Sequence, residues 1–491
     1  MGPEERKKLD RIFNPRGLAL FGGINAGITF GHMFLLSQIR YGYRGAIYPI
    51  SPKGGEIHGL KIYRSLDEVD GPVDLATVSV PAKAVPQVLR ECLKHGLAGA
   101  QIQSSGFAEL GDEEGLILHK EIVSLAGQGL RIIGPNCFGV HCPQGGITLL
   151  PGSDFAKEPG PVAFISQSGG VATSFGYECR YAGLGISKLV SYGNGADLEA
   201  TELLEYLEED PETKYVAAYL EGVRDARKFL QALGRLTPQK PVVIWKAGLT
   251  PLGGRAARSH TGSLAEGADI WAGALKQAGA VTVQGLDETI DALLALCYLK
   301  SRGRKVALVG GGGAAGVYGA DLAHRLGLDL PVFGPETRRE LSKLFSVPGT
   351  SFVNPLDTGT PVLPPEILQA CVRKILTREP VDVLVLSLSL EAIEREIPMH
   401  MEVIGLPRPP QGSQLEALLD PLTQMKKETG KDVAVVFENR AYLLEDLEVE
   451  ETARKMRARF LSEGIPVFFG LQRALRGIKH AFRYASITGR G

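Results

Sequence analysis

Short apolar runs alternate with amphipathic helical patterns along most of the chain. In the first third, the apolar runs predict β-strands at Leu18–Phe21, Ile47–Ile50, Leu75–Val80, Gly99–Gln103 and Leu130–Ile133. Helical periodicity lies between these runs, for example over Val85–His95 and Glu114–Ala126. Strands that alternate with helices build right-handed βαβ units around a parallel sheet. The pattern therefore predicts an α/β fold.

Two later segments repeat the order of strand, glycine cluster and helix. The first opens with the apolar run Pro161–Ile165 and the second with Lys305–Val309. Each run is followed by two glycines at the same spacing, Gly169 and Gly183 after the first run and Gly313 and Gly327 after the second. This repetition predicts one flavodoxin-like, doubly wound sheet that is used twice.

The length of the chain indicates its division into domains. At roughly 100–200 residues per domain, 491 residues correspond to about three domains. We expect them over residues 1–145, 155–300 and 302–491. The stretch Pro398–Leu415 contains the sequence Pro-Arg-Pro-Pro-Gln-Gly, and we predict that it forms an exposed excursion within the third domain.

Composition and charge exclude several classes of function. The formal net charge is −1, which gives no reason to expect a nucleic acid or an acidic membrane surface as partner. Apolar runs such as Val381–Leu386 are far shorter than the roughly 18 residues of a membrane helix, and the charged N-terminus has no signal-peptide core. The six cysteines form no Cys-x-x-Cys pair, so we predict buried thiols and no metal site. We expect a cytoplasmic protein without a membrane anchor.

The first predicted strand leads into a glycine turn, with Gly22, Gly23, Ile24 and Asn25. A glycine turn that feeds a helix exposes N–H groups, which suit a pyrophosphate. The spacing does not match Gly-x-Gly-x-x-Gly, and Lys53 follows the second strand where an NAD enzyme has an acidic residue. A lysine there favours a phosphorylated ribose, as in NADP or CoA; the alternative is a tight turn with an exposed lysine.

Two further polar loops end strands of the same sheet. One carries Ser104, Ser105 and Gly106, and the other carries Asn136 and Cys137. Ligands of open α/β sheets bind at the carboxyl ends of the strands, so these loops predict a long groove that suits CoA. The Cys137 thiol would lie near the pantetheine end of this ligand, although a small packed residue is the more frequent role of a cysteine.

The second α/β segment places a serine-rich loop between a strand and a helix. The loop consists of Ser166, Gln167, Ser168, Gly169 and Gly170. Hydroxyls and bare amides at a helix N-terminus form an anion site, to which the helix dipole contributes about 0.3–1 kcal/mol. A plain helix cap is the alternative.

His260 differs from the other histidines in its surroundings. It lies in Gly253–Ser263, a run of small residues with two arginines that predicts a mobile loop. A histidine nucleophile must be neutral, with one ring nitrogen attacking and the other held by an acceptor. Glu221 ends the apolar strand Tyr215–Leu220 and is the best candidate acceptor; the alternative is a solvated turn residue.

Together these motifs resemble the α subunit of succinyl-CoA synthetase and, more closely, the NDP-forming acyl-CoA synthetases. The most specific motifs are Gly134–Cys137, Ser166–Gly169, Val190–Gly195, Ser259–Ser263 and Asn354–Asp357. The resemblance implies a Rossmann-like CoA-binding domain followed by two flavodoxin-like doubly wound domains. It also implies that His260 is phosphorylated, that Glu221 steadies it, and that the loop Ser166–Gly170 receives the phosphohistidine. The implied reaction is acyl-CoA + phosphate + ADP ⇌ acid + CoA + ATP, through an acyl phosphate.

The chain departs from the family pattern at several places. No segment of these 491 residues is left to form the family's nucleotide-binding ATP-grasp domain. The resemblance therefore implies a β-type partner subunit that brings Mg²⁺ and ADP or ATP. We expect a hetero-oligomer or a homodimer. The first glycine loop has Gly-Gly-Ile-Asn where the acetate-type ligases have Gly-Ala-Ser. A glycine run at Val309–Gly313 replaces a more polar loop, and Ser387–Ser389 replaces a glycine pair.

Two other functions are consistent with parts of the pattern. A CoA-binding regulatory protein would keep the fold without turnover, but histidine, glutamate and serine loop all occur together here. An NADP-dependent oxidoreductase would use the first glycine loop, but no catalytic set accompanies it.

Overall fold

The computed structural model describes residues 1–24, 27–255, 267–345, 350–360, 363–438 and 443–489. The chain forms two compact units, Met1–Thr289 and Ile290–Gly491. The boundary falls within helix α10 (Leu286–Tyr298), which continues from the first unit into the second. The finer division into domains 1–145, 155–300 and 302–491 stays a prediction.

The first unit begins with a parallel sheet of order β2-β1-β5-β6-β7. Its strands are β1 (Gly17–Phe21), β2 (Ala46–Ile50), β5 (Leu75–Val78), β6 (Gly99–Ile102) and β7 (Arg131–Ile133). All of these strands were predicted, with bounds that differ by at most two residues. The register pairs Leu18 with Ile47 on one side and with Leu75 on the other.

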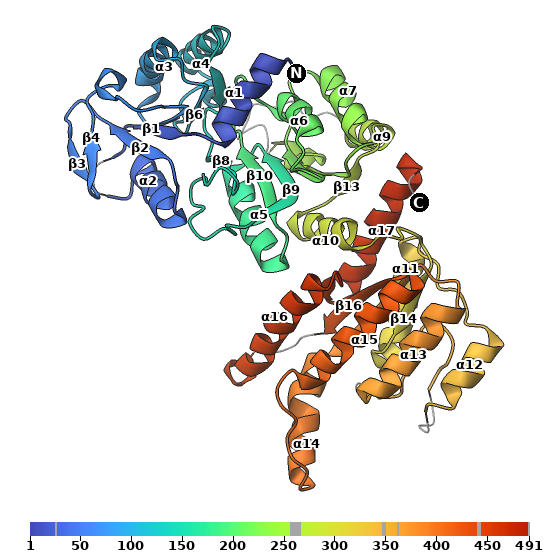
Figure 1. Ribbon diagram of the computed structural model, residues 1–491. Helices are drawn as coiled ribbons and strands as arrows, with labels where there is room; N and C mark the ends of the chain where they lie inside the picture. Colours follow the sequence, from blue (N-terminus) through green and yellow to red (C-terminus); the bar gives the residue numbers. More distant parts are fainter. Residues whose placement is uncertain (25–26, 256–266, 346–349, 361–362, 439–442, 490–491) are drawn as a thin grey trace. The chain divides into compact units, whose positions relative to one another are not determined.

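Helices cover both faces of this sheet (Figure 1). They are α1 (Pro3–Phe13), α2 (Phe30–Tyr41), α3 (Val85–Lys94) and α4 (Glu113–Ala126). Leu18 and Leu20 pack in one core with α1 and α2, whereas Ala19 and Phe21 pack in another core with α3 and α4. Because both faces are covered, β1 is apolar and buried along its whole length.

Several strands were not predicted, and three short ones affect the site region. β3 (Gly55–Ile57) and β4 (Leu60–Ile62) form an antiparallel hairpin behind β2. β8 (Gly139–His141) leaves the first sheet and pairs antiparallel with β10 (Ile186–Ser191) of the next sheet. Runs of three residues are too short to establish a period, so the sequence gives no signal for them.

The second sheet of the first unit has the order β13-β12-β11-β9-β10-β8 and is parallel apart from β8. Its other strands are β9 (Pro159–Ser166), β11 (Tyr215–Leu220), β12 (Val242–Lys246) and β13 (Val281–Val283). Its helices are α5 (Gly169–Ala182), α6 (Ala200–Glu209), α7 (Ala226–Leu236) and α9 (Ala268–Gln277). The core of α1 and α2 continues into this sheet, where Phe13 of α1 stacks on Tyr206 of α6 at 5.1 Å between ring centroids.

The second unit contains a parallel sheet of order β14-β15-β16-β17. The strands are β14 (Val306–Val309), β15 (Val383–Ser389), β16 (Asp432–Glu438) and β17 (Val467–Phe469). An isolated parallel bridge from Val309 to Leu356 extends the sheet beyond β14. With this bridge as its second element, the sheet has the flavodoxin-like order 2-1-3-4-5.

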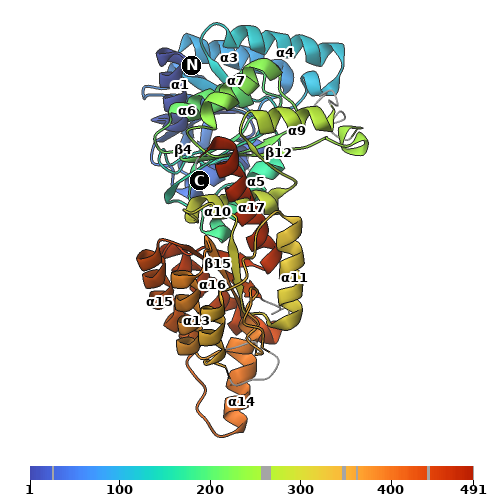
Figure 2. The same cartoon turned by 90° about the vertical axis from the view of Figure 1, so that its right-hand side faces the viewer.

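The helices of the second unit after α10 are α11 (Gly312–Arg325), α12 (Pro335–Ser342), α13 (Pro365–Arg378), α14 (Ile397–Val403), α15 (Ser413–Thr429), α16 (Leu447–Ser462) and α17 (Leu471–Thr488). They cover both faces of this third sheet, with α13 and α15 on one side of β15 and α11 on the other (Figure 2). No helix in the described parts of the chain is long and apolar enough to span a bilayer.

The stretch Pro398–Leu415 is largely exposed, as predicted, and α14 occupies its beginning and α15 its end. β15 extends beyond the apolar run Val381–Leu386 to Ser389, since Ser387 to Ser389 pair with β16 up to Glu438. Sheet pairing thus extends the strand through a polar segment that the apolar pattern alone would exclude.

Candidate active site

The glycine turn after β1 is built for close approach of the backbone. Gly22 and Gly23 have φ values of 77° and 62°, a region that favours glycine. A Cβ on Gly31 in the first turn of α2 would lie 2.3 Å from the Gly22 carbonyl oxygen, so the helix starts directly against the turn. Ile24 is only 3% exposed and belongs to the core, so it anchors the turn and does not offer a side chain to a ligand. Asn25 lies outside the described residues.

The loops after β6 and β7 are joined to each other. The Asn136 N–H donates to the Ser104 carbonyl oxygen at 3.0 Å, and the Ser104 hydroxyl donates to the Val80 carbonyl oxygen behind β5. Ser105 and Asn136 are exposed, and Asn136 has a positive φ of 56°. These loops and Gly22 therefore form one edge at the carboxyl ends of parallel strands. Lys53 is exposed behind β2, at the carboxyl end of a strand of the same sheet.

Cys137 is packed within this edge. Its side chain is 2% exposed, and its thiol donates to the Ile102 carbonyl oxygen at 3.3 Å. Burial raises the pKa of the Cys137 thiol to about 12, so the group is a neutral thiol at neutral pH. The geometry favours a packed residue over a reactive thiol at the pantetheine end.

The serine-rich loop lies at the N-terminus of α5. The Ser168 hydroxyl caps the helix by accepting the Val171 N–H at 3.3 Å, and the Ser166 hydroxyl donates to the Ser168 carbonyl oxygen at 2.8 Å. Gly170 is exposed, and the space beside its Cα is open apart from the Ser168 hydroxyl. The loop thus presents backbone N–H groups at the positive end of the α5 dipole.

Phe138, which follows the first sheet, contacts the loop Ser166–Gly170 at the N-terminus of α5, a candidate anion-binding site that is called the anion seat below. A Cβ on Gly169 would lie 2.7 Å from the Phe138 ring, which immediately follows Cys137. The Phe138 N–H donates to the Ser191 hydroxyl at 3.1 Å. The groove edge of the first sheet and the N-terminus of α5 are therefore neighbours within one unit.

Glu221 lies beside the same loop. It follows β11, whose predicted bounds Tyr215–Leu220 are those observed, and β11 pairs with β9. The Gln167 side-chain oxygen accepts N–H donation from Glu221 and from Gly222, the latter at 2.9 Å. The structure therefore brings Glu221 and the loop Ser166–Gly170 together. His260 lies outside the described residues.

A further loop, residues 192–195, belongs to the site although it was not among the predicted ligands. The Asn194 N–H donates to the Pro135 carbonyl oxygen at 3.0 Å, and its side chain donates to Glu109 at 2.5 Å. A Cβ on Gly193 would lie 2.2 Å from the Asn136 carbonyl oxygen. The motif Val190–Gly195 was the available signal for this loop, but its contacts depend on the neighbouring sheet.

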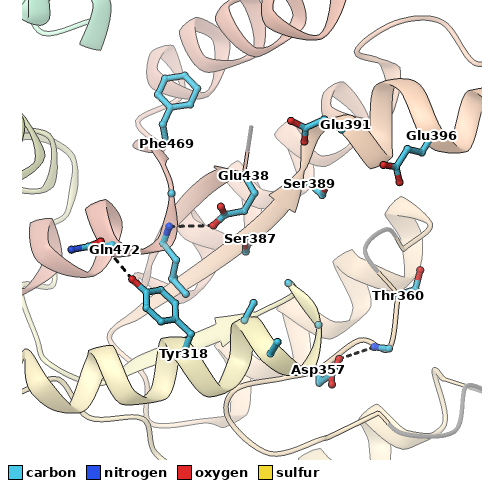
Figure 3. A pocket seen from close by; sticks show the side chains of 18 of the residues that line it. Tyr318, Asp357, Thr360, Ser387, Ser389, Glu391, Glu396, Glu438, Phe469 and Gln472 are labelled. Atoms are coloured by element: carbon cyan, nitrogen blue, oxygen red, sulfur yellow. Dashed lines mark hydrogen bonds between the residues drawn. The ribbon is translucent and has the colours of Figure 1, made fainter. Parts of the chain in front are cut away.

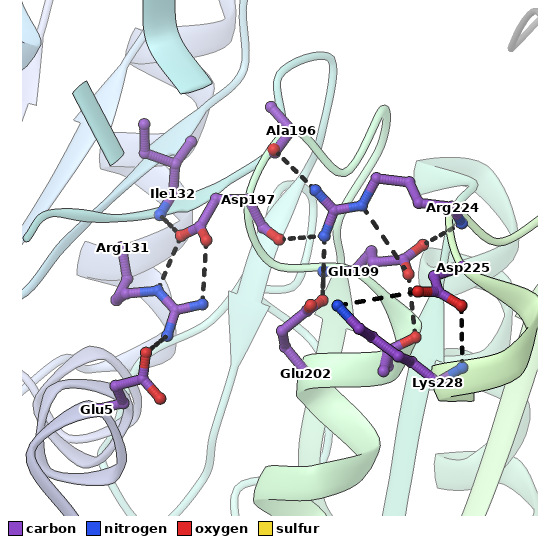
Figure 4. A network of polar contacts seen from close by, with 11 residues as sticks. Glu5, Arg131, Ile132, Ala196, Asp197, Glu199, Glu202, Arg224, Asp225 and Lys228 are labelled. Atoms are coloured by element: carbon purple, nitrogen blue, oxygen red, sulfur yellow. Dashed lines mark hydrogen bonds and ion pairs between the residues drawn. The ribbon is translucent and has the colours of Figure 1, made fainter. Parts of the chain in front are cut away.

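An ion-pair network supports this loop from behind (Figure 4). Asp197 accepts two hydrogen bonds from the Arg131 guanidinium, at 2.8 and 3.0 Å, and one from the Ile132 N–H at 2.8 Å. Arg224 donates to the carbonyl oxygens of Ala196 and Asp197, at 3.0 and 2.6 Å. The network thus ties β7 of the first sheet to the segment between β10 and α6.

The second unit contains a cavity of its own, of about 1150 Å³, at the carboxyl ends of β14 and β15 (Figure 3). The turn between β14 and α11 has positive φ at Gly310, Gly311 and Gly312. Carboxylates line much of this cavity, at Asp357, Glu391, Glu396 and Glu438. Glu438 accepts the Leu471 N–H at the start of α17 at 3.2 Å, while the lining arginines Arg395 and Arg473 pair with Asp446 and Asp291. The cavity is therefore less suited to a bare anion than the N-terminus of α5.

Comparison with known proteins agrees with this arrangement. Residues 18–143 match the model of a CoA binding domain, and residues 159–296 match a succinyl-CoA ligase like flavodoxin domain. The α subunit of acetate–CoA ligase [ADP-forming] II from Pyrococcus furiosus is 38% identical over 352 residues, which cover 71% of this chain and 76% of that protein. The chain belongs to the family of ADP-forming acyl-CoA synthetases.

Other members of the family confirm the fold along the whole chain. The dinucleotide forming acetyl-coenzyme A synthetase 1 of Ca. Korarchaeum cryptofilum, solved with phosphate and ADP, superposes with a TM-score of 0.80 at 30% identity and covers 98% of both chains. Acetate–CoA ligase [ADP-forming] I of Archaeoglobus fulgidus is 32% identical over 98% of this chain but only 64% of its own length. The predicted family, the α/β fold with its Rossmann-like and flavodoxin-like parts, and the class of acid–thiol ligase are confirmed.

Membership in this family also supports two of the predicted small-molecule ligands, CoA and phosphate. The family of ADP-forming acyl-CoA synthetases and the matched CoA binding domain imply that the chain binds CoA and phosphate. The individual ligand residues, the nucleotide with its Mg²⁺ and the partner subunit belong to the proposal that follows.

Proposed function

We propose that this ADP-forming acyl-CoA synthetase transfers phosphoryl groups through His260, with Glu221 as the acceptor that orients its imidazole. The observation that carries the proposal is the contact between Glu221 and the anion seat at the N-terminus of α5. A neutral imidazole whose N–H donates to a carboxylate keeps its other nitrogen available for attack. The matching reaction is acyl-CoA + phosphate + ADP ⇌ acid + CoA + ATP.

The steps follow from the chemistry of the two substrates. Phosphate at the N-terminus of α5 attacks the thioester carbonyl, and the C–S bond breaks to give an acyl phosphate and CoA. The His260 imidazole then attacks phosphorus, the P–O bond to the acyl group breaks, and the carboxylic acid leaves. ADP finally takes the phosphoryl group from His260 and restores the neutral ring. Ser168, Gly169 and Gly170 would stabilise phosphate charge through N–H and hydroxyl groups. Ser166 is buried and its hydroxyl donates to the Ser168 carbonyl oxygen, so it would support the loop and not contact phosphate.

The CoA seat is proposed along the edge of the first sheet. The turn at Gly22 and Gly23 is proposed to bring the start of α2 against the pyrophosphate, and Lys53 is the proposed cation for the phosphorylated ribose. Ser104, Ser105, Gly106 and Asn136 continue the edge toward Phe138 and Gly169, the direction in which the thioester must reach the phosphate. Ile24 and Cys137 would support this edge from its buried side.

A β-type partner with an ATP-grasp fold is proposed to bring ADP or ATP and Mg²⁺. Support comes from the Pyrococcus furiosus relatives, which are named as α subunits, and from the Archaeoglobus fulgidus relative, of which this chain covers 64%. The acid is not assigned, since relatives are named for acetate, 4-hydroxybutyrate and trans-feruloyl substrates.

The decisive experiment supplies radiolabelled phosphate and a panel of acyl-CoA esters to the purified chain with its partner subunit. We expect an acid-labile, base-stable label on the wild-type chain and its loss in His260→Ala. Glu221→Gln should slow labelling by about 10–100-fold, because the imidazole loses its charged acceptor and the remaining amide oxygen is a weaker one. Label that persists in His260→Ala would overturn the assignment of the carrier. CoA binding without any label or turnover would instead indicate a regulatory protein.

A further inference from the structure

Contacts from three neighbouring strands converge on Glu221. The Glu221 N–H donates to the side chain of Gln167, the residue that follows β9. The Glu221 carbonyl oxygen accepts from the ammonium group of Lys246, the last residue of β12, at 2.8 Å. Its carboxylate accepts from the Tyr219 hydroxyl of β11 at 3.1 Å. Backbone nitrogen, backbone oxygen and carboxylate are thus each fixed by a different side chain.

The contact from Gln167 differs in kind from those of its neighbours in the loop Ser166–Gly170. The side-chain oxygen of Gln167 accepts from the N–H groups of Glu221 and Gly222. The backbone N–H of Gln167 donates to the Tyr219 carbonyl oxygen at 3.3 Å, which continues the pairing of β9 with β11. The Ser168 hydroxyl and the exposed Gly170 face the open N-terminus of α5 instead. Gln167 therefore spans from the anion seat to the turn that carries the carboxylate.

Tyr219 and Lys246 hold the same turn from its other sides. Burial and the nearby Glu221 charge raise the pKa of Tyr219 above its usual range, so its hydroxyl stays a neutral donor. The Lys246 ammonium also donates to the Ala247 carbonyl oxygen at 2.6 Å and lies 4.9 Å from the Trp271 ring centroid. A residue held at so many atoms is suited to a role that depends on orientation.

We propose that Gln167 is a positioning residue: it fixes Glu221 relative to the N-terminus of α5 and acts through Glu221, not on phosphate. The inference rests on the proposed function, in which Glu221 orients the phosphorylated imidazole. Without the Gln167 acceptor, the N–H groups of Glu221 and Gly222 lose their common partner and the turn shifts. A displacement of about 1 Å at such a group lowers a reaction rate by up to about 100-fold.

A double-mutant cycle tests this role. Gln167→Leu should slow the labelling of His260 by about 10–100-fold and leave the KM for phosphate within about threefold of the wild-type value. In the Glu221→Gln background, Gln167→Leu should add less than about threefold, because both changes remove the same orientation of the imidazole. Ser168→Ala is the matched control within the loop, and it should raise the KM for phosphate because it loosens the cap of α5.

A second variant covers the case in which Gln167→Leu does not fold. Gln167→Asn keeps the amide but shortens the side chain by one methylene group, so its oxygen no longer reaches the N–H groups of Glu221 and Gly222. It should slow labelling with an unchanged KM for phosphate, again without further effect in Glu221→Gln. Multiplying effects in either cycle, or a raised KM for phosphate in Gln167→Leu, would overturn the proposal. Absence of label on the wild-type chain would overturn the proposed function itself and is thereby distinguished.

Discussion

The Tyr192 side chain is buried without a hydrogen-bond partner for its hydroxyl in the described part of the chain. It belongs to the loop that contacts Asn136, and its N–H donates to the Ser166 carbonyl oxygen at 2.9 Å. Burial, together with the charges of Glu199 and Glu221, raises the pKa of this phenol well above its usual range. A buried hydroxyl that makes no hydrogen bond costs about 1–3 kcal/mol.

Tyr192→Phe should therefore raise the free energy of unfolding by about 1 kcal/mol, since the ring is kept and the unpaired hydroxyl is removed. Urea titration of the wild-type chain and of the variant measures the difference. Tyr206→Phe is the matched control, because the Tyr206 hydroxyl donates to Asp10 at 2.8 Å and its removal should destabilise. A lower stability of Tyr192→Phe would contradict the prediction and indicate a partner for the hydroxyl.

At the same scale, the residue types of the site were readable from the sequence, but some roles were not. Ser168 caps α5 as its position before the helix predicts. Gln167 was predicted only as a member of the phosphate loop, because its contact with Glu221 arises from the pairing of β9 with β11, which are separated by β10 along the chain. Ile24 and Cys137 were predicted beside CoA from their places in loops that follow strands, whereas their burial depends on packing against residues far along the chain.

At the scale of elements, the apolar pattern predicted the strands of the first sheet, but it did not predict β10, β12 and β16, which are also buried, and it failed for short or polar segments. β1 and β11 are apolar along most of their length and were located within a residue. β8 has only three residues, and its partner β10 lies far along the chain, so no local period marks it. β15 continues through Ser387 and Ser389 because β16 supplies hydrogen bonds that the sequence does not reveal.

One buried carboxylate connects elements of the first sheet and gives a pH-dependent prediction. Asp74, which precedes β5, accepts hydrogen bonds at 2.8 Å from Arg11 of α1 and from Arg16 before β1. Burial alone would raise the pKa of Asp74, but the hydrogen bonds from Arg16 and Arg11 outweigh it and lower the pKa to about 2. Because the folded-state pKa lies below the unfolded value of about 3.9, the stabilisation is present above about pH 4 and is lost as the pH falls toward 2.

Asp74→Asn should consequently lower the free energy of unfolding by about 1–3 kcal/mol at pH 7. The difference from the wild-type chain should shrink between about pH 4 and pH 2, where the wild-type carboxyl also becomes neutral. Urea titrations across this range measure it. Asp67→Asn is the control, since its ion pair with Lys94 is exposed and worth at most about 1 kcal/mol. A difference that stays constant down to pH 2 would contradict the assigned pKa.

On the scale of the whole molecule, the site of the first unit exists only because two sheets meet. The glycine and asparagine loops belong to the first sheet, while the anion seat and Glu221 belong to the second. The sequence predicted that both sheets belong to the α/β class. It did not predict the contact between Phe138 and Gly169, because this contact depends on β8, which follows the first sheet in sequence but pairs with β10 of the second. In the proposed reaction, phosphate must reach the thioester carbonyl, which requires the loops of the two sheets to stay in register.

Asp197 is the residue on which this register depends most directly. Its carboxylate binds the Arg131 guanidinium and the Ile132 N–H of the first sheet, while the segment before it contacts the loop of Asn136. Asp197→Ala should lower the free energy of unfolding by about 2–4 kcal/mol, because Arg131 is 8% exposed and would keep an incompletely paired charge. It should also weaken CoA binding by about tenfold if about 1.4 kcal/mol of that loss reaches the loop.

Glu202→Gln, which alters the more exposed Arg224 contact at 3.2 Å, should change neither quantity by more than about 1 kcal/mol. Thermal unfolding and CoA titration of both variants measure these effects, and an Asp197→Ala chain with wild-type stability and affinity would show that the sheets are held together by their apolar core alone.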